Sequence, residues 1–216
     1  PRWSVYPKQT VRRWLLVRMR AGRERTRVVP VVERYFGAAR ALEARPDGGP
    51  AEVRPTGEAR RTAEAALQAR GVLGGPFVAI APGAQHATKR WPPERWAELA
   101  LKLASERLRV VLVGGPEDAQ LAASIAADVP GAVSVAGELN VLESAAVLER
   151  AACVASGDTG VMHLATAVGA PVVALFGPTT HHLGFFPYAA RATVIERPLP
   201  CRPCSTHGGR SEEHSL

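Results

Sequence analysis

The sequence of 216 residues lacks several features, and each absence narrows what the protein can be. It contains three cysteines, too few for a disulfide framework, which agrees with a reducing compartment. No uninterrupted apolar run approaches the roughly 20 residues that a membrane-spanning helix needs. No secretory signal peptide is visible. We therefore expect a cytoplasmic protein with one well-buried domain and an appendage, or with two small domains.

Two nucleotide-binding motifs are also absent. The sequence has no G-x-G-x-x-G fingerprint and no P-loop lysine motif, which argues against dinucleotide binding and NTP hydrolysis. The formal net charge of +7 favours an anionic partner or surface. No basic-aromatic binding motif accompanies this charge, so we expect no nucleic-acid binding.

Apolar runs alternate with helical patterns along most of the chain. The short runs predict five buried strands, at 77–81, 108–113, 133–136, 151–155 and 171–176. Apolar residues at helical spacing lie between them, most clearly after Pro93. This order predicts an α/β fold with a Rossmann-like, doubly wound parallel sheet. Ligands of such sheets bind outside the carboxyl ends of the strands.

Three loops fall at that edge of the predicted sheet, at 82–92, 114–118 and 156–163. The third begins with Ser-Gly-Asp-Thr-Gly, where the free backbone N–H groups of a helix N-terminus are expected. Such groups bind anions. We therefore expect a phosphate group at this turn.

Residues 1–45 do not begin like a complete domain, and there is no initiator Met. In 8–27, arginines interleave with apolar residues. This basic stretch could lie on an anionic membrane, face a phosphorylated acceptor, or form a helix with a solvated arginine face. A further helix is expected within 28–44. The turn-rich segment 45–50 marks a predicted boundary between residues 1–45 and a second domain at 46–216.

Three motifs, in this order, resemble one family. They are P-G-A-x(4)-K-R-W-P at 82–92, V-G-G-P-E-D at 113–118, and S-G-D-T-G-V-M-H-L-A-x-A-x-G-x-P-x-V-A-L-F-G-P-T at 156–179. Together they resemble the lipopolysaccharide-core heptosyltransferases of glycosyltransferase family 9. V-x-E-R-Y-F at 31–36 is similar to that family's passage between its two domains.

The resemblance implies a GT-B fold of two facing Rossmann-like domains, with the acceptor in the N-terminal one and the nucleotide-sugar in the C-terminal one. This chain would be the C-terminal half, together with the end of the acceptor domain. The family's catalytic base is a carboxylate in a glycine-rich loop near the N-terminus. Nothing before Pro46 matches such a loop. We therefore assign no base and expect this chain alone to be inactive.

A nucleotide diphosphate needs N–H groups and a cation, and the resemblance suggests which residues supply them. Thr159 and Gly160 would donate backbone N–H groups, and Thr159 would add a hydroxyl. Lys89 would neutralise the departing phosphate oxygen and so stabilise transition-state charge. The alternative for Lys89 is a surface lysine beside Arg90.

The remaining donor-binding candidates each have a structural alternative. Glu117 would accept hydrogen bonds from ribose hydroxyls, or stabilise a helix N-terminus. Asp158 would bind sugar hydroxyls, cap the helix, or do both. His163 would lie near the phosphates, or be a buried, hydrogen-bonded histidine. Thr88 and Asn140 complete the set at the pocket rim.

The implied reaction is inverting transfer of heptose from an ADP-activated donor to a lipid-linked or lipopolysaccharide-core acceptor, without metal or cofactor. A peripheral contact with the inner face of the inner membrane would accompany it. Cys201 and Cys204, followed by His207, have zinc-ligand spacing, although two free cysteines explain them more simply. Two alternatives stay open: a non-catalytic nucleotide-sugar-binding module, and a basic protein that binds membrane or nucleic acid.

Overall fold

The computed structural model describes residues 8–19, 28–72 and 74–206, and its centre is a parallel sheet. Six strands lie in the order β3-β2-β1-β4-β5-β6, and every neighbouring pair is parallel. Their bounds are β1 (Phe77–Ala81), β2 (Arg109–Leu112), β3 (Val133–Ser134), β4 (Cys153–Gly157), β5 (Val172–Phe176) and β6 (Ala192–Glu196). The chain runs outward from β1 to β3 and then returns to β4 on the other side of β1. This reversal is a topological switch point, where open α/β sheets bind ligands.

The five predicted strands are confirmed, and the sheet has one strand more than predicted. This strand, β6, pairs with β5 from Val172 to Phe176. Its sequence, A-T-V-I-E, is only partly buried along its length. An edge strand of this kind lacks the continuous apolar run that marks the central strands.

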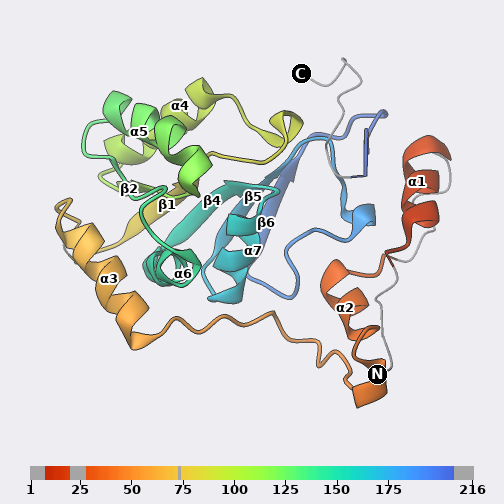
Figure 1. Ribbon diagram of the computed structural model, residues 1–216. Helices are drawn as coiled ribbons and strands as arrows, with labels where there is room; N and C mark the ends of the chain where they lie inside the picture. Colours follow the sequence, from red (N-terminus) through yellow and green to blue (C-terminus); the bar gives the residue numbers. More distant parts are fainter. Residues whose placement is uncertain (1–7, 20–27, 73, 207–216) are drawn as a thin grey trace.

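Helices cover both faces of the sheet, as expected for a doubly wound fold (Figure 1). One face packs against α3 (Gly57–Gln68), α6 (Val141–Arg150) and α7 (Gly160–Ala167), and the other against α4 (Pro93–Ser105) and α5 (Ala119–Asp128). Successive strand residues point to opposite faces. In β1, Phe77 and Ala79 therefore join the first core, whereas Val78 and Ile80 join the second, beside the buried Trp96 of α4.

The N-terminal segment lies beside the sheet, at the side opposite α3 (Figure 1). It contains α1 (Thr10–Met19), α2 (Val31–Phe36) and a 3-10 turn, η2 (Arg40–Leu42). The buried Arg34 of α2 donates to the carbonyl oxygen of Leu183 at 2.6 Å, and the Val31 N–H donates to Gly184 at 2.9 Å. These bonds attach the segment to the loop that follows β5.

One helix of this segment is shorter than the sequence pattern predicts. Within 28–44, the α-helix is confined to α2 and is followed by η2. In the basic stretch, α1 is the described helical part, and 20–27 lie outside the described residues. Residues 46–56 run as an extended connection to α3, so the domain boundary at 46 stays a prediction. Among the described residues, no helix has the length and apolarity needed to cross a membrane.

Candidate functional site

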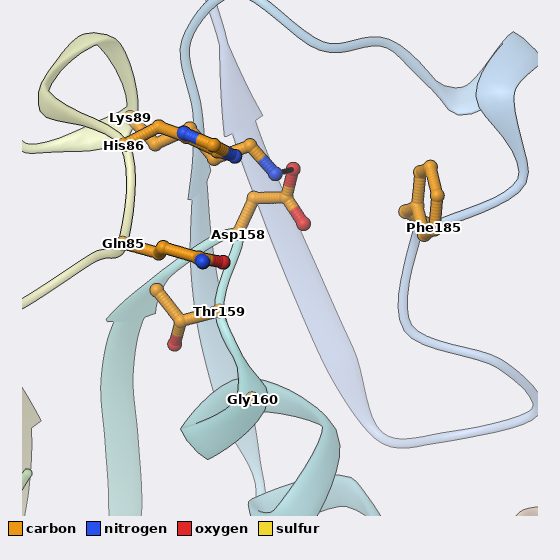
Figure 2. Close-up of a pocket in the computed structure, with 7 residues that line it drawn as sticks. All are labelled: Gln85, His86, Lys89, Asp158, Thr159, Gly160 and Phe185. Carbon is orange, nitrogen blue, oxygen red and sulfur yellow. Dashed lines mark ion pairs between the residues drawn. The ribbon is translucent and has the colours of Figure 1, made fainter. Parts of the chain in front are cut away.

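A cavity of about 250 Å³ opens at the switch point of the sheet. Its lining comes from three parts of the chain: the loop after β1, the turn between β4 and α7, and the loop after β5 (Figure 2). The lining residues are Gln85, His86, Lys89, Asp158, Thr159, Gly160 and Phe185. Two of the three loops expected at this edge therefore meet around one cavity.

An ion pair between Lys89 and Asp158 lies across the cavity (Figure 2). The Lys89 Nζ is 2.6 Å from Asp158 Oδ2, and the two side chains are 14% and 5% exposed. The same carboxylate oxygen accepts a hydrogen bond of 2.7 Å from the hydroxyl of the buried Thr179. A buried carboxylate needs such partners, because an uncompensated charge is costly away from water.

The turn after β4 leaves the start of α7 open to the cavity. Asp158 is not the N-cap residue of this helix, and its Oδ2 is engaged by Lys89 and Thr179. Thr159 is the N-cap residue but makes no capping bond, and its hydroxyl lies 3.1 Å from the Ser156 hydroxyl. A Cβ placed on Gly160 would meet no atom within 4 Å. The first N–H groups of α7 can therefore receive an anion.

Glycines let the loop after β1 approach the neighbouring strands and so position Lys89. Lys89 is the last residue of a 3-10 turn, η3 (Ala87–Lys89). A Cβ on Gly157 would lie 3.4 Å from the Lys89 carbonyl oxygen, and one on Gly177 would lie 3.3 Å from that of Thr88. The turn thus rests on the ends of β4 and β5, which directs Lys89 toward Asp158.

Asp118 couples the loops after β1 and β2. It ends the 3-10 turn η4 (Pro116–Asp118), and its Oδ2 accepts a hydrogen bond of 3.1 Å from the Gly115 N–H. The carboxylate occupies the place that a side chain on Gly83 would need: a Cβ there would be only 1.8 Å from Asp118 Oδ1. The glycine of the first motif therefore accommodates the aspartate of the second.

Two further side chains shape the electrostatics around the ion pair. Burial lowers the pKa of His163, and the nearby Asp158 raises it less than burial lowers it. The imidazole is therefore neutral near pH 7. Phe185 forms an apolar wall, with Lys89 Nζ 6.0 Å and Arg13 Cζ 5.0 Å from its ring centroid. A cation near an aromatic face is attracted by the ring quadrupole.

The comparison with protein-family models identifies the chain. Residues 8–214 match the model of glycosyltransferase family 9 (heptosyltransferase). The chain belongs to glycosyltransferase family 9.

Relatives in family 9 agree with this match. Lipooligosaccharide heptosyltransferase 2 of Haemophilus influenzae is 32% identical over 126 residues, which are 56% of this chain and 36% of the relative. A family 9 structure from Veillonella parvula has a TM-score of 0.69 at 25% identity, covering 80% of this chain and 51% of that one. The ADP-heptose lipopolysaccharide heptosyltransferase II of E. coli has a TM-score of 0.64 at 27% identity, covering 77% and 53%. The chain therefore spans about a third of the curated relative, and its α/β sheet matches part of the GT-B structures.

The structure brings together four of the eight donor-binding candidates around one cavity. Lys89, Asp158, Thr159 and Gly160 line one cavity, whereas the other four candidates do not line it. Glu117 is exposed in η4, and Asn140 accepts a bond from the Glu143 N–H as the N-cap of α6. Thr88 and His163 are the remaining two candidates that do not line the cavity. All eight donor-binding roles stay predictions.

Four residues at the site were not predicted. Gln85 and His86 occupy variable positions of the first motif, and Thr179 is the last letter of the third, so a motif-based search could have found them. Phe185 follows the motifs in a loop without any pattern, so the sequence offered no signal for it.

The C-x-x-C pair lies near the end of the described chain. Cys201 and Cys204 are not joined by a disulfide, and their sulfur atoms lie 3.8 Å apart. His207, the third ligand considered for zinc, lies outside the described residues. Within residues 8–19, 28–72 and 74–206, no three His, Cys, Asp or Glu residues are grouped as a metal site.

Proposed function

We propose that this chain is the donor-binding part of a heptosyltransferase that uses ADP-heptose and acts on the lipopolysaccharide core. The observation that carries the proposal is the Lys89 ammonium facing the open start of α7 across one cavity. A cation and free N–H groups are the two things that a diphosphate requires. The E. coli relative is named for ADP-heptose, which supports the choice of nucleotide-sugar.

The proposed position of the donor follows from the order of the strands. The diphosphate lies between Lys89 and the Gly160 N–H group, at the switch point. The adenosine extends toward the loop after β2, where the exposed Glu117 carboxylate can accept ribose hydroxyls. The heptose faces the opposite side of the cavity, toward Phe185.

Lys89 has the central chemical role in this proposal. When the bond between the anomeric carbon and the diphosphate breaks, negative charge develops on the departing phosphate oxygen. A preformed ammonium in a largely buried site stabilises that charge without reorganising solvent. Asp158 is the only carboxylate among the described residues that line the cavity, and it is engaged by Lys89. We therefore assign no residue of this chain as the base that deprotonates the acceptor.

Calorimetric titration with ADP tests the donor-binding role. We expect ADP to bind this chain more tightly than UDP or GDP. Lys89→Ala should weaken ADP binding about tenfold or more, which is roughly 1.4 kcal/mol. Lys102→Ala is the matched control, because it removes the same charge from an exposed position on α4 and should leave the affinity unchanged. A folded wild-type protein that binds no nucleotide would overturn the proposal.

A transfer assay tests the reaction itself. With ADP-heptose and a core acceptor, this chain alone should show no turnover, because no base is assigned within it. Transfer by this chain, abolished by Lys89→Ala, would contradict the view that the base lies elsewhere and would retain the role of Lys89. Binding of ADP without discrimination from UDP and GDP would instead favour a general anion site.

A further inference from the structure

We propose that Thr179 is a positioning residue of this pocket: its hydroxyl holds the Asp158 carboxylate and so allows the Lys89 ammonium to turn to a diphosphate. The inference rests on the proposed function, because it concerns the ion pair when an anionic ligand enters. Neither the family match nor the motif roles assign a function to Thr179.

The ion pair poses a difficulty for anion binding. Lys89 Nζ lies 2.6 Å from Asp158 Oδ2, so the pocket's cation is already engaged. The ammonium has three N–H donors, so it can turn toward a diphosphate while its contact with Asp158 weakens. Asp158 would then lose part of its counter-charge at a place where only 5% of its side chain meets solvent. An uncompensated buried carboxylate is strongly unfavourable, so Asp158 needs a partner that stays.

Thr179 is placed to be that partner. Its hydroxyl is 2.7 Å from Oδ2, the same oxygen that Lys89 contacts. Thr179 is 0% exposed, so the hydroxyl is shielded from competing water. A hydrogen bond to an ionised carboxylate is among the stronger ones in proteins. This bond does not involve Lys89 and can persist when the ammonium moves.

A buried arginine fixes Thr179 in turn. Arg202 is 6% exposed and donates to the carbonyl oxygens of Thr179 at 2.6 Å and Phe176 at 3.3 Å. Its charge is balanced by Glu196 at 2.8 Å. The Cys204 N–H also donates to the Pro178 carbonyl oxygen at 3.0 Å. The segment 202–204 thus holds the loop after β5 at three carbonyl oxygens, which fixes the direction of the Thr179 hydroxyl.

Removing the hydroxyl should therefore weaken diphosphate binding indirectly. In Thr179→Val a methyl group replaces the hydroxyl at nearly constant volume. Asp158 then depends on Lys89 alone, and the ammonium is released less readily. We expect ADP affinity to fall about tenfold. Thr179→Ser keeps the hydroxyl and should bind ADP within about twofold of the wild type.

A double-mutant cycle with Asp158 distinguishes this role from a merely structural one. In Asp158→Asn the buried charge is gone, so the hydroxyl has no carboxylate to hold. Adding Thr179→Val to Asp158→Asn should then change ADP affinity by less than about twofold. Calorimetry on the full chain measures all of these affinities, and thermal unfolding shows that each variant is folded. If Thr179→Val does not fold, Thr179→Ala replaces it and should show the same loss.

The outcomes distinguish failure of the Thr179 role from failure of the whole donor site. Wild-type affinity in Thr179→Val, or an equal loss in the Asp158→Asn background, overturns the role of Thr179 while leaving the donor site intact. A Thr179→Ser variant as weak as Thr179→Val does the same. Failure of the folded wild type to bind either ADP or inorganic pyrophosphate overturns both this inference and the proposed function.

Discussion

Gly83 offers the sharpest test of how the motif loops fit together. In Gly83→Ala, the new Cβ would lie 1.8 Å from Oδ1, 2.1 Å from Cγ and 2.6 Å from Oδ2 of Asp118. These distances are far below van der Waals contact, so the carboxylate must leave. Asp118 also packs closely against Gly114, where an added Cβ would lie 2.7 Å from the Asp118 Cβ. The side chain would have to swing outward and give up its bond to the Gly115 N–H.

The expected loss of stability follows from these two effects. Overpacking of a well-filled site costs typically about 1 to 3 kcal/mol. The lost hydrogen bond from the Gly115 N–H adds about 1 kcal/mol. We therefore expect Gly83→Ala to lower the free energy of unfolding by about 2 to 4 kcal/mol. Urea denaturation followed by circular dichroism measures this change, and ADP titration should show weakened binding because Lys89 lies in the same loop.

Two further variants make the test specific. Gly57→Ala is the control, because a Cβ there meets only the Arg61 guanidinium at 3.7 Å and lies at the start of α3. It should be neutral or slightly stabilising. In Gly83→Ala/Asp118→Ala the clash is removed, so the double variant should be about as stable as Asp118→Ala alone. A Gly83→Ala protein within about 0.5 kcal/mol of the wild type, or strictly additive losses, would refute the reasoning.

Three more changes have definite expected outcomes. Asn140→Ala removes the cap of α6 and should lower the urea-derived free energy of unfolding by about 1 kcal/mol, with ADP affinity unchanged; a large loss of affinity would instead favour a donor contact. Trp96→Ala removes a side chain that is 1% exposed and should lower the free energy of unfolding by about 3 to 5 kcal/mol, measured by thermal or urea denaturation. A small loss would contradict the place of Trp96 in the core. Burial lowers the pKa of His163 below its ordinary 6.5, so the unfolded chain binds that proton more readily and stability should fall as pH drops below about 6.5. His163→Gln should lose this part of the acid sensitivity, and an unchanged pH slope would contradict it.

The sheet was predictable where burial is complete. Central strands such as β1 and β4 lie between two layers of helices, so they appear in the sequence as continuous apolar runs. The edge strand β6 gave no such signal, because it is only partly buried and includes Thr193 and Glu196. The helix cap at Asn140 is visible in the sequence as N-x-x-E, and the structure shows this cap, while the donor contact of Asn140 stays a prediction.

The site was predictable only as far as the motif loops reach. Lys89 and Asp158 lie in separate motifs, and parallel topology brings the ends of their strands together. The sequence did not indicate that the two would form an ion pair, nor that Thr179, 21 residues further on, would share the same oxygen. Such contacts depend on the path of each loop, which is set by close approaches at glycines such as Gly157.

The pairing of β1 with β4 has a consequence for how the protein holds together. Of the pairings in this sheet, it joins the strands that are furthest apart along the chain, since β2 and β3 with their helices intervene. Contacts between distant segments carry the largest entropic cost of closure and form slowly. Lys89 stands on one side of this seam, and Asp158 and Gly160 stand on the other. An anion bound between them would link the two strands of the least local pairing in the sheet, so ligand binding in the cavity would also stabilise the sheet.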